Sequence, residues 1–217
     1  MKSAVGYIDE VGRNSVAGDL YSCCLVGDLP FLQVNGITID DSKKLTEEER
    51  EVVWGYLRDR VVYGIGKVTV KEINEIKNVH TATLLSFARA VNICSIKPTS
   101  VFIDGKYTIP QKFLNMYNLS LVQHTVVHGD SRILNISAAS IIAKVELDHA
   151  MRALHDQYPA YDFYSNKGYF CPRHGVAIKK YGTTEYHRTW MNQVQRVLRG
   201  EYDHIIERKY QHYWRTV

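Results

Sequence analysis

The sequence predicts a mixed α/β fold in which helices cover the faces of a sheet. Three short apolar runs come first, helical periodicity follows, and a strand–strand–helix order comes after it. The tight connections between the first three runs favour antiparallel neighbours among them. With 217 residues, the chain is long enough for one well-buried domain and a modest appendage. We therefore expect a main domain over 1–158 and a helical extension over 159–217, packed beside it.

The individual elements follow from periodicity and from residues that begin or end helices. The predicted strands cover residues 4–9, 20–26, 61–70, 100–104 and 119–127. The predicted helices cover residues 46–60, 71–77, 79–92, 136–158, 172–181 and 184–199, and the tail from 202 to 217 is predicted as a last helix. Thr46 with Glu49 three positions later is a capping box, which fixes the start of the first helix.

Composition and charge restrict the function only loosely. The chain is 45% hydrophobic and 23% charged, with a formal net charge of +4, which permits a nucleic-acid partner without requiring one. None of the four cysteines forms a CxxC pair, so we expect free thiols in a reducing compartment. No stretch approaches the ~20 apolar residues of a membrane span, and no apolar signal segment opens the chain. These features predict a cytoplasmic protein without a membrane partner.

Acidic residues follow several of the predicted strands. Asp9 and Glu10 close the first strand, Asp104 closes the strand at 100–104, and Asp130 follows the strand at 119–127. Three of them have an alternative interpretation, since Asp9 and Asp130 suit turns or helix caps and Glu10 suits a solvated surface. Brought together at one sheet edge, however, the four carboxylates would repel one another strongly unless divalent cations neutralised them. Oxygen ligands of this kind suit Mg²⁺ or Mn²⁺, and His/Cys spacing for zinc is absent.

Six motifs, in order from about residue 4 to residue 190, resemble those of the ribonuclease HII (type 2 ribonuclease H) family. They are YIDEVGR at 7–13, DSKKL at 41–45, IDG at 103–105, GDSR at 129–132 with the helix ISAASIIAKV at 136–145, KGY at 167–169, and GTTEYHR at 182–188. The resemblance implies a ribonuclease H-like fold, which is a five-stranded mixed sheet flanked by helices, with a small helical C-terminal extension. The domain over 1–158 would then be the catalytic one.

The same resemblance implies the reaction and the partner. The expected activity is two-metal hydrolysis of the RNA-containing strand in RNA–DNA hybrids and in DNA duplexes with embedded ribonucleotides. The cut falls 5′ to the ribonucleotide and leaves 3′-hydroxyl and 5′-phosphate ends. The implied metal ligands and catalytic residues are Asp9, Glu10, Asp104 and Asp130, and we expect a monomer. Two alternatives stay open, namely a nuclease of the same fold with another specificity and a nucleic-acid-binding module with a decayed site.

Substrate contacts are predicted at several further positions. The family's Gly-Arg-Gly turn, which contacts the 2′-hydroxyl, matches Gly12, Arg13 and Asn14, and its sugar-packing tyrosine matches Tyr169. Asn14 departs from the second glycine of that turn, and its side chain would stand near the 2′-hydroxyl. Phosphate contacts are predicted for Ser42 and Lys43, although a solvated turn would explain them as well, and a basic wall is predicted around His187 and Arg188.

Overall fold

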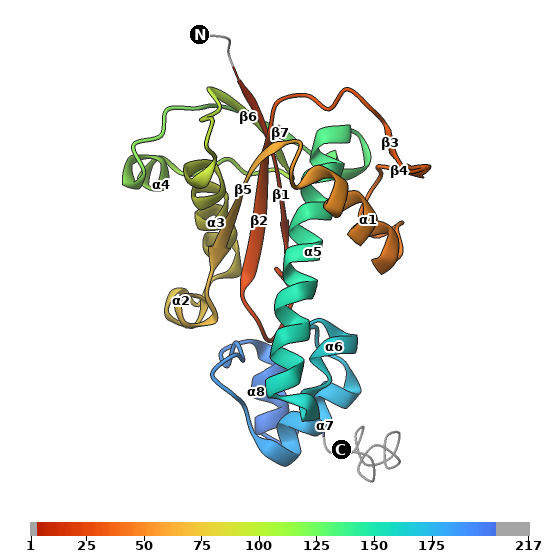
Figure 1. Cartoon of the computed structure of the whole chain (residues 1–217). Coiled ribbons are helices and arrows are strands. Elements are labelled where there is room, and N and C mark those ends of the chain that lie inside the picture. Colours follow the sequence, from red (N-terminus) through yellow and green to blue (C-terminus); the bar gives the residue numbers. More distant parts are fainter. Residues whose placement is uncertain (1–3, 203–217) are drawn as a thin grey trace. The chain divides into compact units, whose positions relative to one another are not determined.

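A five-stranded mixed sheet forms the frame of the computed structural model, which describes residues 4–202 (Figure 1). The strand order is β5-β2-β1-β6-β7. β2 lies antiparallel to both β1 and β5, whereas β1–β6 and β6–β7 are parallel. The strands are β1 (Val5–Val11), β2 (Leu20–Val26), β5 (Val62–Val68), β6 (Ser100–Asp104) and β7 (Val122–Val126). The predicted mixed fold and the antiparallel neighbours among the first strands are confirmed.

Helices of the same unit cover both faces of this sheet. On one face, the small residues of α5 (Leu134–Gln157) pack with α1 (Glu47–Leu57) and with Leu25 of β2 around a buried apolar cluster. On the other face, α3 (Val79–Ile93) approaches β5 closely at Gly66, where an added Cβ would clash with the Ser86 carbonyl oxygen. The glycines that interrupt the apolar alternation of β5 therefore permit the contact with α3.

The remaining elements are short. They are β3 (Gln33–Val34), β4 (Ile37–Thr38), α2 (Val70–Ile76), α4 (Gln111–Met116), α6 (Phe163–Asn166), α7 (Pro172–Tyr181), α8 (Asn192–Leu198) and 3₁₀ turns at Gly129–Ser131 and Pro159–Tyr161. The β3–β4 hairpin and α4 were not predicted. The capping box at Thr46 is confirmed. The predicted helix over 184–199 is wrong in its first half, because the Thr184 amide donates to the His187 ring and His187 forms a β-bridge with Ala17.

The described residues group into two compact units. The first comprises residues 4–11, 20–68 and 80–146, and therefore holds the sheet. The second comprises residues 12–19, 69–79 and 147–202, and therefore holds the loop between β1 and β2, α2, the end of α5 and the last helices. The division into domains at residue 158 stays a prediction, and the predicted helix at 202–217 lies outside the described residues. Within residues 4–202, none of the helices has the length and apolar character needed to cross a membrane.

Candidate functional site

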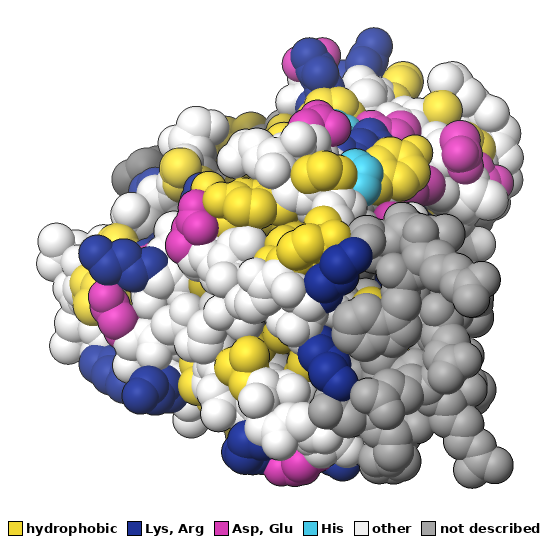
Figure 2. Space-filling model, turned by 90° about the horizontal axis from the view of Figure 1, so that it is seen from below, with side chains coloured by type: hydrophobic (Ala, Val, Ile, Leu, Met, Phe, Trp, Pro, Cys, Tyr) yellow, Lys and Arg dark blue, Asp and Glu magenta, His cyan; other side chains and the backbone are white. Residues whose placement is uncertain are grey.

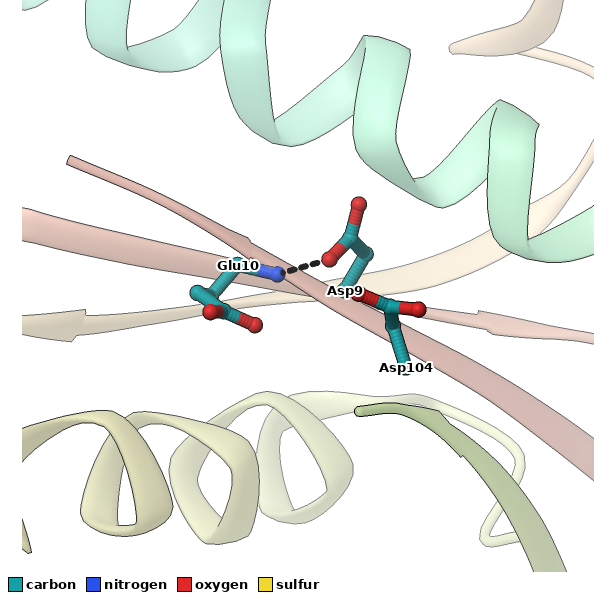
Figure 3. Close-up of side chains that lie close together, drawn as sticks. All are labelled: Asp9, Glu10 and Asp104. Atoms are coloured by element: carbon teal, nitrogen blue, oxygen red, sulfur yellow. Dashed lines mark hydrogen bonds between the residues drawn. The ribbon is translucent and has the colours of Figure 1, made fainter. Parts of the chain in front are cut away.

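Three of the four predicted metal ligands come together at the junction of β1 and β6. The parallel pairing aligns Ile8 with Ile103, so Asp9 and Asp104 are the next residues of the two strands. Glu10 follows on β1, and Figure 3 shows its side chain on the opposite side of the strand from Asp9. One carboxylate oxygen from each of these three residues nevertheless lies within 4.8 Å of the others, which is a spacing that a divalent cation can bridge.

Asp9 is buried, and its surroundings disfavour a bare negative charge. Burial, followed by the charges of Glu10 and Asp104, raises the pKa of the Asp9 carboxyl well above its usual range. Two hydrogen bonds act in the opposite direction, one from the Ser140 hydroxyl and one of 2.8 Å from the Glu10 amide to Asp9 Oδ1. A bound cation would relieve the repulsion among the three carboxylates, so these side chains fit a divalent metal.

A glycine turn orients Asp104. The Gly129 amide donates a 2.6 Å hydrogen bond to Asp104 Oδ1, and an added Cβ on Gly129 would lie 2.7 Å from Ile136 and 3.3 Å from that same oxygen. Burial raises the pKa of Asp104, the Gly129 amide lowers it, and the charge of Asp130 raises it again. A side chain at position 129 would therefore displace the end of Ile136 and crowd the Asp104 carboxylate.

Asp130, the fourth predicted ligand, is buried but stands outside the cluster of three carboxylates found among the described residues. Its Oδ2 accepts a 3.1 Å hydrogen bond from Lys43 Nζ. The Lys43 side chain is 77% exposed, so its ammonium group neutralises Asp130 while remaining open to solvent. The charge of Asp130 still acts on Asp104, and the two acids therefore belong to one electrostatic site.

Ser42 supports the site from within the protein. Its side chain is buried, and its hydroxyl lies 3.0 Å from the hydroxyl of Ser140 on α5. Because the Ser140 hydroxyl proton is used on Asp9, Ser42 donates to Ser140. The two hydroxyls thus form a chain that ends on the Asp9 carboxylate. The sequence predicts no role for Ser140, because its partner Ser42 lies 98 positions away in the chain.

The loop Gly12–Asp19 belongs to the second unit. Gly12 has a φ of 81°, whereas Arg13 and Asn14 are exposed and do not have positive φ. The backbone of this turn therefore places no demand for glycine at position 14, and Asn14 adds only its side chain. The departure from the Gly-Arg-Gly pattern therefore leaves the backbone of the turn unstrained at position 14.

Tyr169 lies against this loop. The Gly168 carbonyl accepts hydrogen bonds from the Val16 and Ala17 amides, at 2.8 and 3.1 Å. Tyr169 is 37% exposed. Burial raises the pKa of its phenol, and the charge of Arg188 and the Gly12 backbone partly offset that rise. The second unit thus joins two of the predicted recognition elements, the turn at residues 12–14 and Tyr169.

Arg188 is fully buried in the same unit. Its guanidinium donates to the backbone carbonyls of Gly12, Arg13, Gly18 and Asp19, at distances from 2.7 to 3.2 Å. Burial lowers its pKa to about 10, so the group remains charged. This placement favours support of the loop over the predicted basic wall, and substrate contact by Arg188 stays a prediction.

His187 is also fully buried. Burial first, and the neighbouring His174 second, lower its pKa to about 3, so it is uncharged at neutral pH. A neutral buried ring cannot add to a basic wall by its charge. Figure 2 shows Lys and Arg side chains spread over one face of the molecule, with acidic and apolar side chains between them. Charge alone therefore marks no groove on the described part of this face.

Comparisons with known proteins identify the family and the fold of this chain. The family model described as ribonuclease HII matches residues 6–198. The ribonuclease HII of Phocaeicola vulgatus is 39% identical over 185 residues, covering 85% of this chain and 87% of the relative. The solved ribonuclease H2 of Pyrococcus horikoshii OT3 aligns with a TM-score of 0.73 and 27% identity, over 95% of this chain and all of that chain. The solved Bst-RNase HIII in complex with Mn²⁺ aligns with a TM-score of 0.69 and 16% identity, over 91% of this chain and 70% of that chain, and shows the fold alone.

The predicted family and the ribonuclease H fold are therefore confirmed, and the matched span includes all six motifs. The chain belongs to the ribonuclease HII family and is a type 2 ribonuclease H endonuclease.

Proposed function

We propose that this enzyme hydrolyses the RNA-containing strand of RNA–DNA hybrids and of DNA duplexes with embedded ribonucleotides, with Mg²⁺ or Mn²⁺ as the cofactor. The cut would fall on the 5′ side of a ribonucleotide and leave 3′-hydroxyl and 5′-phosphate ends. The single observation that carries the metal requirement is the cluster of Asp9, Glu10 and Asp104. Three mutually repelling carboxylates, one of them buried, are stable together only with protons or cations.

The side chains of the first unit have distinct proposed roles. Asp9, Glu10, Asp104 and Asp130 would hold the metal ions. Bound as a pair, divalent ions supply an activated water for in-line attack and charge stabilisation at the leaving oxygen. The Ser140 hydroxyl and the Gly129 amide orient Asp9 and Asp104 for this task.

Lys43 has a second role in this proposal. Its ammonium group neutralises Asp130 in the structure, and because the side chain is exposed it would also contact a phosphate oxygen of the substrate. Ser42 would act indirectly, because its hydroxyl is directed to Ser140 inside the protein. We therefore retain Lys43 as a substrate-binding residue and assign Ser42 to the support of Asp9.

Recognition of the ribonucleotide is assigned to the second unit. The backbone of Gly12, Arg13 and Asn14 would contact the 2′-hydroxyl, and the Tyr169 ring would pack on the sugar of the next nucleotide. The positive φ of Gly12 and the exposure of Arg13, Asn14 and Tyr169 support this proposal. A 2′-hydroxyl is the group that distinguishes RNA from DNA at a single position.

The proposal is tested with matched duplexes that carry no ribonucleotide, one ribonucleotide, or a continuous RNA strand. We expect cleavage of the last two only, dependence on added Mg²⁺ or Mn²⁺, and loss of cleavage in EDTA. Mapping of end-labelled products identifies the cut position and the end groups. Cleavage of the all-DNA duplex would indicate a nuclease of other specificity, and binding without cleavage would indicate a decayed site.

Tyr169→Ala provides the matching specificity test. Packing on a sugar should be at the low end of the ~1–3 kcal/mol range for nucleotide stacking, so we expect about a tenfold loss of kcat/KM at a single ribonucleotide. The loss on a continuous hybrid should be smaller, because a hybrid can be engaged in many registers. Equal losses on both substrates would assign Tyr169 to the fold instead. Action as a monomer in the cytoplasm stays a prediction, which sedimentation and fractionation would test.

A further inference from the structure

Two buried histidines of the second unit have no role in the proposed reaction. His174 on α7 and His187 lie with their Nε2 atoms 3.1 Å apart, and both rings are fully buried. The rings of Tyr161 and Phe163 lie against both histidines, with centroid distances from 4.9 to 6.2 Å. A pair of polar rings in such an apolar surrounding is costly unless each nitrogen has a partner.

The outer partners of the pair fix where the protons lie. At one end, the Thr184 amide donates to His187 Nδ1 at 2.9 Å, so this nitrogen is an acceptor. At the other end, His174 Nδ1 lies 3.0 Å from the Tyr169 carbonyl oxygen, which can only accept, so this nitrogen carries a proton. For two neutral rings, His187 must then donate from Nε2 to Nε2 of His174. A single directed chain of hydrogen bonds therefore runs from Thr184 to the backbone of Tyr169.

Both rings are neutral at neutral pH. Burial lowers the pKa of His174 to about 4, against opposing effects from the Tyr169 carbonyl and the charge of Asp162. Burial and the neighbouring ring lower the pKa of His187 to about 3. A second proton on either ring would also make two hydrogen-bond donors face each other. On His174 it would face the Nε2–H of His187, and on His187 it would face the Thr184 amide. The chain is thus complete in the neutral state, and all four ring nitrogens have partners.

We propose that His174 and His187 are positioning residues that fix the backbone at Tyr169, and through it the recognition of a single ribonucleotide. The inference rests on the proposed role of Tyr169. The backbone that the histidine pair holds also contacts the loop at residues 12–19. The Gly168 carbonyl, one residue before Tyr169, accepts hydrogen bonds from the Val16 and Ala17 amides. A shift of the Tyr169 carbonyl would therefore disturb both the ring and its contact with the loop.

A pair of substitutions at position 174 separates this role from simple packing. His174→Phe keeps a ring of similar size but removes the donor to the Tyr169 carbonyl. His174→Asn is smaller, but its side-chain amide stands near the position of Nδ1 and can restore that donor. We expect His174→Phe to lower kcat/KM at a single ribonucleotide three- to tenfold more than on a continuous hybrid, and His174→Asn to recover most of that difference. Equal losses on both substrates, or no recovery with Asn, would overturn the inference.

A double-mutant cycle with Tyr169→Ala tests the route of the effect. If His174 acts through Tyr169, His174→Phe should not change the ratio between the two substrates any further in the Tyr169→Ala background. A full additional change would overturn the inference while leaving the role of Tyr169 intact. If Tyr169→Ala alone leaves the ratio unchanged, the proposed role of Tyr169 has failed, and the inference falls with it.

The wild-type protein supplies a measurement that does not depend on the folding of a variant. Nitrogen-15 chemical shifts of the imidazole rings at pH 7 should show His174 protonated only at Nδ1 and His187 only at Nε2. Both signals should stay unchanged between pH 6 and pH 8. A different tautomer, or a charged ring in this range, would contradict the hydrogen-bond chain and overturn the inference.

Discussion

Asp9→Asn should abolish cleavage and, in the absence of metal, make the protein more stable. The substitution keeps the size of the side chain and removes one charge from the cluster that Asp9 forms with Glu10 and Asp104. The lost carboxylate is a proposed metal ligand that no neighbouring side chain replaces. The same lost charge ends a repulsion that raises the pKa of Asp9 well above its usual range. Activity and stability should therefore change in opposite directions.

The size of the gain follows from the spacing of the carboxylates. Two unit charges at 4.8 Å, the upper limit of the spacing, repel by about 3.5 kcal/mol at an effective dielectric constant of ~20. Partial protonation of Asp9 already relieves some of this repulsion, so about 1–2 kcal/mol should be recovered by the neutral side chain. For a chain of this length, each kcal/mol corresponds to roughly 2–4 °C in Tm. We therefore expect the Tm of metal-free Asp9→Asn to exceed that of the wild type by ~2–8 °C.

The stability that Asp9→Asn gains over the metal-free wild type should depend on pH in a defined direction. The folded-state pKa of Asp9 lies above its unfolded value of about 3.9, so the folded state binds more protons than the unfolded state between these two values. Wild-type stability consequently falls as the pH rises from about 4 through the folded pKa. The advantage of Asp9→Asn should be small near pH 4 and should reach its full size above the folded pKa.

Thermal unfolding in EDTA from pH 5 to pH 9, repeated with added Mg²⁺, measures these changes. Mg²⁺ should raise the Tm of the wild type more than that of Asp9→Asn. Asp59→Asn is the matched control, because the Asp59 side chain is 70% exposed on the surface and should change neither Tm nor cleavage. An Asp9→Asn protein that is no more stable than the wild type in EDTA at pH 8 would refute the reasoning from repulsion. Near-normal turnover in saturating Mg²⁺ would refute the ligand assignment.

Three further variants address the surrounding residues. Asp130→Asn should reduce turnover by about tenfold, because Lys43 already neutralises this acid. The loss should be smaller than in Asp9→Asn and should depend more strongly on which metal is added. Wild-type rates across Mg²⁺ and Mn²⁺ titrations would leave Asp130 as a helix cap. Asn14→Gly should hold or improve cleavage at a single ribonucleotide. The backbone at position 14 is not strained, so the substitution only removes a side chain that would stand near the 2′-hydroxyl. A drop in kcat/KM would show that the Asn14 side chain assists binding. Arg188→Gln should lower the Tm by at least ~5 °C, because several carbonyls of the Gly12–Asp19 loop lose their hydrogen-bond donor. Each unsatisfied buried carbonyl reduces the free energy of unfolding by about 1–3 kcal/mol. An unchanged Tm would contradict the supporting role of Arg188.

Local sequence patterns were sufficient to predict most of the sheet. β2 and β6 begin and end at the predicted residues, because each is an apolar run bounded by polar or turn-forming residues. The β1–β6 pairing that sets Asp9 beside Asp104 joins residues about 95 positions apart. No local pattern specifies that register, and the meeting of the acids was predicted only from the general geometry of strand ends and from the family motifs.

The sequence does not show which of the polar residues are buried. Arg and His are mostly exposed or half-buried in proteins, so the sequence predicts a nucleic-acid surface at Arg188 and His187. Their burial depends on partners distant in the chain, namely the carbonyls of the loop at residues 12–19 and the ring of His174. The hydroxyl chain from Ser42 through Ser140 to Asp9 was hidden for the same reason.

The order of residues at the end of β1 links cleavage and recognition in one segment. Asp9 and Glu10 supply carboxylates to the cluster in the first unit, and Gly12, two residues later, opens the turn assigned to the 2′-hydroxyl. Activity on a single substrate therefore cannot tell a damaged metal site from a damaged turn, because a change in either lowers the rate. The ratio between a single ribonucleotide and a continuous hybrid can tell them apart, since loss of a metal ligand should lower both rates alike. Loss of the support from Arg188 should instead lower the rate on a single ribonucleotide more than the rate on a continuous hybrid, because only the single ribonucleotide must be engaged in one register.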